Sequence, residues 1–184
     1  MRDVIKKLTP EQALEVLMRL SHHRGAIRDT VLAEARNVLS EIDLDETAAE
    51  VFFALDSIDV HDCWDRAGSS GDSYTSPDDA ALELIEAQLQ PFFDQTKRYH
   101  ELGLLEEEDT YCRGVILGIY RYEHESKSEF RQWAVDIPIE CAGALLAQWR
   151  ERGRDAVSAA AMDAFIRDRC PHWTRDFLRT GGPT

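Results

Sequence analysis

The sequence predicts an all-α protein, and three observations carry that prediction. A helix start, in which Ser or Thr precedes Pro and acidic or amide residues, occurs at Thr9-Pro10 and again at Ser76-Pro77. Apolar residues recur after these starts at spacings of three and four, which is the helical period. Strand signals do not recur along the chain. We therefore expect about seven helices in antiparallel pairs, arranged as a helical-repeat stack or as an irregular helical bundle.

Capping residues and glycines divide the first part of the chain. Thr9 caps the first expected helix, which Gly25 ends or interrupts, and a second helix follows directly. Asp45 is expected to cap a third helix, which continues through Trp64 and stops at Gly68. Each of these helices has apolar residues at helical spacing, so each should bury one face.

The segment GSSGDSYTS, residues 68–76, predicts an exposed and mobile loop, because its Gly and Ser residues leave little to pack. Ser76 caps the helix that follows, Pro91 should kink that helix or split it in two, and Gly103 ends it. Four acidic residues at 106–109 then form the first turn of another helix. Carboxylates offset the helix dipole there, which explains them more simply than ion binding does.

The helix that begins with this acidic turn has apolar residues on nearly every side up to Tyr122, so we expect other helices to enclose it. Gly114 and Gly118 lie about one turn apart and would let a neighbouring helix approach closely. Each glycine costs up to about 1 kcal/mol in helix propensity relative to Ala, so packing should compensate. Whether the neighbouring helix belongs to the same chain or to another is left open by the sequence.

The C-terminal part continues the helical pattern. After a loop over residues 130–137, a helix is expected from Pro138 to Gly153. Asp155 caps a last helix, which Pro171 breaks or kinks before a short final turn.

Length and charge limit the organisation and the partners. A chain of 184 residues fits one domain, which we expect to cover residues 1–180, followed by a disordered tail at 181–184. The net charge of -14 argues against broad nucleic-acid or membrane-surface binding, because both of those surfaces are anionic. Residues 131–184 carry a net charge of only +1, and their arginines should mostly pair with acidic groups within the fold.

The cysteines and the N-terminal sequence indicate a compartment. The four cysteines lie far apart and form no C-x-x-C pair, so they are expected to be reduced, mostly buried residues of a cytoplasmic protein. The start MRDVIKKLTP has no long apolar run, and no later stretch approaches about 18 apolar residues, so no signal peptide or membrane span is expected. No cofactor motif is present, and we expect no cofactor.

The segments LTPEQALEVLMRL and AIRDTVLAEARNVL resemble a helix pair of HEAT-type repeat proteins. They are also similar to the helical regions that accompany SWIM zinc fingers in uncharacterised bacterial proteins. The resemblance covers roughly the first 40 residues. The chain lacks the cysteine and histidine pattern of the zinc finger, and Arg28-Asp29 departs from the usual HEAT order. The resemblance implies a scaffold that binds other proteins, and it carries over no catalytic residue.

The leading functional hypothesis is therefore a non-enzymatic, cytoplasmic protein-interaction module with a protein partner, and a homo-oligomer is left open. The stretch GVILGIYRYEHESKSEF, residues 114–130, leads from an enclosed helix into a polar end where several side chains share a face. Trp133 is the tryptophan expected to be exposed, while Trp64 and the others are expected to anchor the core. The candidate partner-binding residues are Tyr120, His124, Lys127, Arg131, Trp133, Arg150 and Arg154.

Two other functions are weaker alternatives. A small metal-dependent enzyme would use Asp59, Asp62 and Asp65, which follow at three-residue steps in DSIDVHDCWDRAG, together with His124 and other ligands from elsewhere in the fold. No EF-hand, H-x-x-x-H, Walker or G-x-S-x-G motif supports catalysis. Nucleic-acid binding through the C-terminal arginines is the least favoured, because the chain as a whole is acidic.

Overall fold

The computed structural model describes residues 2–70 and 73–178, and the chain divides into two compact units. Unit 1 is Met1–Glu41 and unit 2 is Ile42–Thr184, where the sequence predicted one domain over residues 1–180. The physical reason lies in burial: the hydrophobic core cluster runs from Ala48 to Trp173, and no described side chain of residues 4–41 is buried. The tail predicted at 181–184 lies outside the described residues.

Unit 1 consists of α1 (Arg2–Ile5), α2 (Pro10–Ser21) and α3 (Ala26–Ser40), with α2 and α3 packed against each other. The predicted start of α2 is confirmed. The Thr9 hydroxyl accepts the Gln12 backbone N–H at 3.3 Å, and the Gln12 side chain accepts the Thr9 N–H at 3.0 Å. Gly25 precedes α3 with a φ of 88°, a conformation that a side chain would strain.

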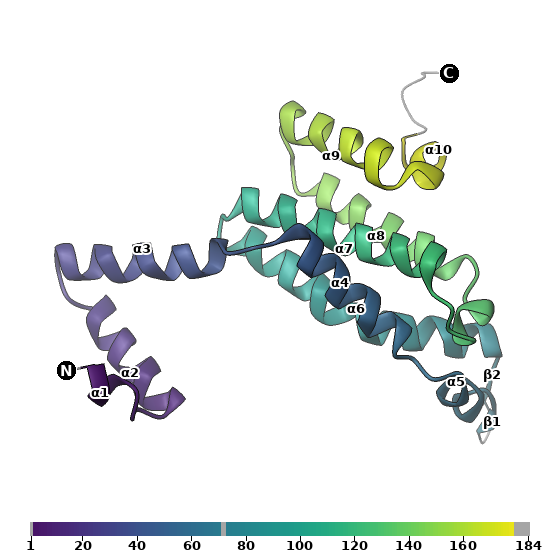
Figure 1. The fold of residues 1–184 in the computed structure, drawn as a ribbon, viewed down its shortest axis with the longest axis horizontal. Coiled ribbons are helices and arrows are strands. Elements are labelled where there is room, and N and C mark those ends of the chain that lie inside the picture. The colour runs from purple at the N-terminus through teal and green to yellow at the C-terminus, as the bar shows by residue number, and fades with distance from the viewer. Residues whose placement is uncertain (1, 71–72, 179–184) are drawn as a thin grey trace. The chain divides into compact units, whose positions relative to one another are not determined.

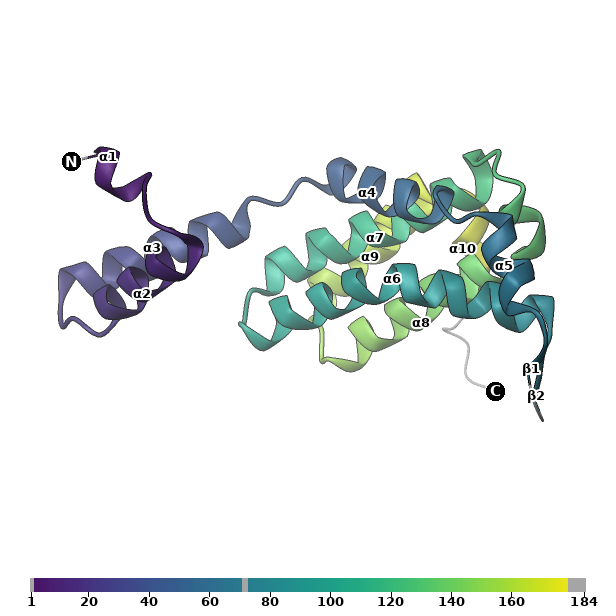
Figure 2. The same cartoon turned by 90° about the horizontal axis from the view of Figure 1, so that it is seen from below.

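Unit 2 is all-α apart from one short hairpin, which confirms the predicted fold class (Figures 1 and 2). Its elements are α4 (Leu44–Asp56), α5 (Val60–Arg66), β1 (Gly68–Ser70), β2 (Ser73–Thr75), α6 (Pro77–Glu101), α7 (Leu105–Glu125), the 3₁₀ turn η1 (Phe130–Trp133), α8 (Ile137–Glu151), α9 (Ala156–Arg169), the 3₁₀ turn η2 (Pro171–Trp173) and α10 (Thr174–Phe177). Among the described residues, no helix combines the length and the apolar character needed to cross a bilayer.

The helix α7 lies at the centre of unit 2 and contacts α4, α6, α8 and α9. Eleven of its 21 residues are buried, as expected for a helix with apolar residues on nearly every side. In a repeat stack each unit contacts only its neighbours along the chain, whereas here α4 packs on α7 with two helices between them in sequence. The packing therefore fits the irregular-bundle alternative.

The two glycines of α7 allow the close approach of α4. A Cβ built on Gly114 would lie 2.7 Å from Thr47 Cβ, and one built on Gly118 would lie 2.6 Å from the Ala48 carbonyl oxygen and from Val51 Cβ. Real Cβ atoms essentially never come that close to other heavy atoms, so only glycine fits at these positions. The helix that these glycines admit thus belongs to the same chain.

Two predicted helix boundaries need correction. Asp43, not Asp45, caps α4 by accepting the Glu46 N–H at 2.9 Å. Asp45 instead pairs with Arg121 at 3.1 Å and with Arg169 at 2.7 Å, which connects α4 to α7 and α9. The third helix also does not continue through Trp64, because it ends at Asp56 and α5 starts afresh at Val60.

The segment predicted as an irregular loop, residues 68–76, contains the antiparallel pair of β1 and β2, with Gly68 opposite Thr75 and Ser70 opposite Ser73. The expectation that it is mobile stays a prediction, and residues 71–72 lie outside the described part. Pro91 does not split its helix, since α6 runs unbroken from Pro77 to Glu101. The cap of α6 is confirmed, with the Ser76 hydroxyl accepting the Asp79 N–H at 3.1 Å.

Candidate functional site

Ring contacts connect the polar end of α7 with η2. The Tyr120 ring stacks on the His124 imidazole with centroids 4.2 Å apart, and the His124 ring stacks on that of His172 at 4.6 Å. Tyr120 Oη lies 3.0 Å from His172 Nδ1, and the indole N–H of buried Trp173 donates to Glu123 Oε2 at 3.1 Å. Helical spacing predicted that the α7 members share a face. It could not predict His172, which lies 52 positions after Tyr120.

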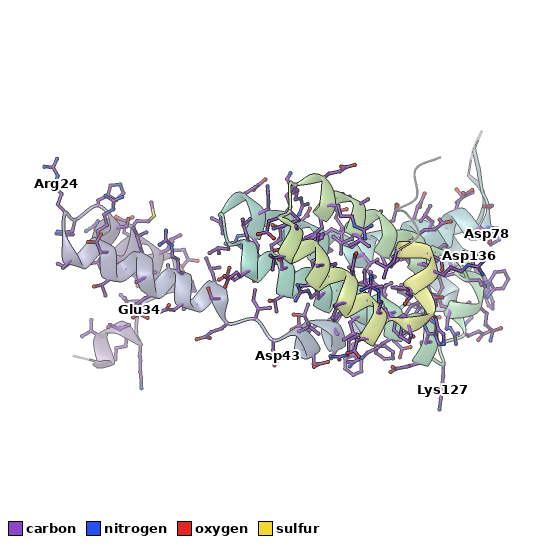
Figure 3. The ribbon with its side chains drawn as sticks, turned by 90° about the horizontal axis from the view of Figure 1, so that it is seen from above. Arg24, Glu34, Asp43, Asp78, Lys127 and Asp136 are labelled. Atoms are coloured by element: carbon purple, nitrogen blue, oxygen red, sulfur yellow. The ribbon has the colours of Figure 1, made fainter. Side chains whose placement is uncertain are left out.

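A cleft of about 450 Å³ lies between the last turn of α7 and the segment around η1. It brings together three of the predicted partner-binding residues: His124, Lys127 and Arg131. Lys127 is exposed and extends away from the ribbon (Figure 3), whereas Arg131 is half-buried and donates from Nη1 to the Ser126 carbonyl at 3.1 Å. The lining comprises Glu123, His124, Ser126, Lys127, Ser128, Arg131, Gln132, Ala134 and Val135.

Hydrogen bonds and burial set the electrostatics of this cleft. His124 Nδ1 lies 2.9 Å from the Tyr120 carbonyl oxygen, which can only accept, so the imidazole donates from Nδ1 and the neutral ring keeps a lone pair on Nε2. Burial raises the pKa of the Glu123 carboxyl above its ordinary value, although nearby His124 and the Trp173 indole act in the opposite direction. The cleft therefore presents two cationic side chains, Lys127 and Arg131, beside a carboxyl group whose pKa is raised by burial.

Residues 126–130, which lead from the end of α7 into η1, are held by contacts with α4 and with the hydrophobic core. Ser126 is buried, and its hydroxyl donates to the Asp56 carboxylate at the end of α4. The Ser128 N–H in turn donates to the Ser126 hydroxyl at 3.0 Å, and the Phe130 ring is fully buried in the core. The loop predicted over 130–137 thus contains one 3₁₀ turn, and the contacts of Ser126, Ser128 and Phe130 hold the chain where it enters that turn.

Two tryptophans from different elements meet at the surface next to this segment. Trp64 of α5 and Trp133 of η1 are 43% and 39% exposed, and their rings contact edge to face with centroids 6.5 Å apart. The prediction that Trp133 is exposed is confirmed. The prediction that Trp64 is a core anchor is wrong, because α5 starts afresh at Val60 and buries Val60 and Cys63 instead.

Arg154 was predicted to bind a partner, and the structure shows that it is not available. Its side chain is 5% exposed, pairs with Glu108, lies 3.3 Å from Asp109, and places its guanidinium 5.0 Å from the centre of the Trp149 ring. Glu108 also accepts from Arg152 at 2.8 Å, and Asp109 from the Trp149 indole at 2.8 Å. These contacts bind the turn between α8 and α9 to the start of α7.

Sequence reasoning missed this buried charge cluster. It assigned the acidic run at 106–109 to the helix dipole alone, although Glu108 and Asp109 are buried and bound to arginines. The excess of arginine in the last third was the available signal, and pairing within the fold was correctly expected for it. Arg150 is partly engaged in the same way, donating to Asp163 at 3.2 Å and to the Phe177 carbonyl at 3.3 Å.

The structure does not group Asp59, Asp62 and Asp65 with one another as metal ligands. Asp59 lies before α5 and caps it, its carboxylate accepting the His61 N–H at 2.9 Å, so it does not share a helical face with the other two. Throughout the described residues, no group of three or more His, Cys, Asp or Glu side chains is arranged to hold a metal ion. All four cysteines are free and buried, which confirms the expectation from their spacing.

Comparison with known proteins does not assign a family. No family model, no curated protein and no solved structure matches the chain. The resemblance of the first 40 residues to HEAT repeats and SWIM-associated helices stays a prediction. The function is therefore argued from the site alone.

Proposed function

We propose that the chain is a protein-interaction module that binds a segment of a partner protein at the end of α7. The binding surface, here called the α7 surface, comprises the cleft beside Lys127 and Arg131 and the tryptophan pair Trp64 and Trp133. The observation that carries the proposal is this pair of exposed, mutually contacting indoles drawn from two elements. Tryptophans of this kind are enriched among the residues that dominate binding energy.

The pair is suited to binding because it is rigid as well as exposed. Each indole is more than half buried by its own unit, so little side-chain entropy is lost when a partner covers the rest. Val135 lies two residues after Trp133, is exposed, and also lines the cleft, which extends the apolar surface toward the cations. An apolar side chain of the partner would pack on the indoles.

The charges beside the pair favour an acidic partner segment. Lys127 and Arg131 are cationic side chains lining the cleft of a chain whose net charge is -14, and burial raises the pKa of the Glu123 carboxyl, which also lines the cleft. A carboxylate of the partner would accept from Lys127 and Arg131 while its neighbouring apolar side chain covers Trp133. The partner chemistry we propose is thus an aromatic or aliphatic residue close to Asp or Glu.

The proposed role is binding, and it assigns no chemical step to the titratable groups of the site. His124 Nδ1 donates to the helix backbone, and the Glu123 carboxyl accepts from the Trp173 indole. We place the protein in the cytoplasm, which is supported by four free, buried thiols that a reducing compartment would preserve.

The test is selection of a peptide-display library on the full chain, followed by affinity measurements through tryptophan fluorescence. Peptides with an apolar residue next to an acidic one should be enriched. Trp133→Ala should weaken their binding by about 30-fold or more, the loss typical of a dominant interface residue. Lys127→Glu should weaken it further through repulsion of the acidic residue.

Phe53→Ala is the matched control, because Phe53 is also an exposed aromatic residue of unit 2 but does not line the cleft. It should leave the affinity unchanged. Equal binding by wild type and Trp133→Ala would contradict the proposal, and so would enrichment of basic peptides.

A further inference from the structure

Unit 1 leaves its large apolar side chains uncovered. α2 and α3 contact each other, yet neither helix has a buried residue. Of the sixteen large apolar side chains that are exposed in the described residues, nine belong to residues 4–41, less than a quarter of the chain. The nine are Val4, Ile5, Leu14, Val16, Leu17, Met18, Ile27, Leu32 and Val38, here called the unit 1 apolar surface.

A helical hairpin of this kind needs a cover in order to be stable. The two helices have 12 and 15 residues, and isolated helices of that length are marginal in water. Helices gain most of their stability by burying one face, and Leu14, Leu17 and Met18 form such a face at spacings of three and four. Because these residues stay exposed within unit 1, another surface has to complete its core.

We propose that a second copy of this chain provides that surface, so that two unit 1 hairpins pair into a four-helix bundle around a two-fold axis. Such an interface is self-complementary, so a single amphipathic hairpin supplies both sides of it. Two antiparallel helices per copy with short connections are the usual halves of a four-helix bundle. This inference concerns unit 1 and is independent of the partner proposed for the α7 surface.

The charge distribution favours self-association at unit 1. Residues 1–41 contain seven Lys or Arg and six Asp or Glu, a net charge of +1, whereas the whole chain has -14. Two copies of unit 1 therefore approach with only weak net repulsion, although most of each chain is acidic. A mixed, nearly neutral surface with large apolar side chains is the composition expected of a homodimer interface.

The charges along α2 are also complementary to those of its own copy. Glu11 and Glu15 lie in its first half, Arg19 lies in its last turn, and Arg24 projects from the turn that follows (Figure 3). In a dimer whose two-fold axis crosses α2, the helix runs antiparallel to its copy. Glu15 already pairs with Arg19 of the same helix at 2.7 Å, and Glu11 of one α2 then faces the Arg24 end of the other, which favours the antiparallel orientation over the parallel one.

The area available is close to what a stable dimer needs. Nine large side chains, each 41–70% exposed, present an apolar surface on the order of several hundred Å² per copy. A standard interface buries about 800 Å² per partner. The members of the unit 1 apolar surface that share a side of the hairpin, such as Leu14, Leu17 and Met18, form the centre of the proposed interface, and the charged residues around them form its edge.

Sedimentation equilibrium of the full chain tests the proposal. The wild type should show a concentration-dependent mass that approaches twice the 21.0 kDa of one chain. Leu17→Asp should raise the dissociation constant at least 10-fold, because it places a charge in the centre of the interface. Val157→Asp is the control, since Val157 is 78% exposed on α9 of unit 2, and it should leave the dimer intact.

Hydrogen exchange distinguishes a second copy from a cover within one chain. If a second copy covers unit 1, the protection of the α2 and α3 amides rises with protein concentration and falls in Leu17→Asp. Protection that is independent of concentration would overturn the proposal. A mass of one chain at every concentration would overturn it as well, as would equal effects of Leu17→Asp and Val157→Asp. Tryptophan fluorescence checks that unit 2 stays folded in each variant, because all four tryptophans lie there.

Discussion

Replacing Gly118 with Ala should separate α7 from α4 and destabilise unit 2. The added methyl group would lie 2.6 Å from the Ala48 carbonyl oxygen and 2.6 Å from Val51 Cβ. The oxygen belongs to the backbone of α4, so no side-chain rotation relieves the contact. The helices have to move apart by several tenths of an ångström, and that loosens the packing of α7 against its neighbour.

The expected magnitude follows from two opposing effects. Overpacking of a close-packed core typically costs about 1–3 kcal/mol, occasionally more, and a backbone contact belongs at the upper end. Against this, Ala is better than Gly in a helix by about 1 kcal/mol. We therefore expect Gly118→Ala to lower the free energy of unfolding by about 1–2 kcal/mol, or Tm by roughly 3–6 °C for a unit of this size.

Urea unfolding followed by tryptophan fluorescence measures this change, because all four tryptophans lie in unit 2. Gly143→Ala is the matched control. Gly143 lies within α8, and its added Cβ would meet only Phe177 Cε1, at an ordinary 3.5 Å. It should stabilise by about 0.5–1 kcal/mol through propensity alone. A Gly118→Ala protein as stable as the Gly143→Ala protein would refute the reasoning.

Three further predictions concern the buried groups. Arg154→Met should lower the free energy of unfolding, measured in urea, by about 3 kcal/mol. This is near the low end for breaking a buried ion pair, because Arg152 still binds Glu108. An unchanged urea midpoint would contradict this prediction. Burial raises the pKa of the Glu123 carboxyl, so the folded state favours its protonated form. The contribution of this carboxyl group to the free energy of unfolding is therefore full below about pH 4.3, the ordinary pKa of Glu, and is lost as pH rises through the raised pKa. Glu123→Gln should therefore match the wild type at pH 4 and be more stable at pH 7, and parallel stability curves would rule this out. Burial also raises the pKa of the Cys141 thiol to about 11, and all four cysteines are buried. An aromatic disulfide reagent should therefore label none of the four thiols until urea unfolds unit 2.

The helix starts were the most predictable part of the fold. Thr9, Ser76 and Asp155 cap helices as their neighbours in sequence indicated, because a cap depends on groups within one turn of the chain. The third helix shows the limit of this local reasoning. Asp45 was the predicted cap, whereas Asp43 caps the helix and Asp45 pairs with arginines of α7 and α9.

Only the α7 residues of the candidate site could be predicted from the sequence. Tyr120, His124 and Lys127 follow one another along the end of α7, so their proximity could be expected from spacing. His172 and Trp173, which complete the site, come from a different part of the chain. The same holds for Trp64, whose exposure depends on which face α5 turns toward the core.

By itself, the sequence determined the all-α class, most helix starts and the enclosure of α7, since these follow from periodicity and local backbone chemistry. The tertiary structure alone decided that α4 fills the space beside Gly114 and Gly118 and that Arg154 is buried against Glu108. It also decided that unit 1 keeps its apolar residues uncovered. The reason is that burial and ion pairing depend on which surfaces meet, and those surfaces come from residues far apart in the chain.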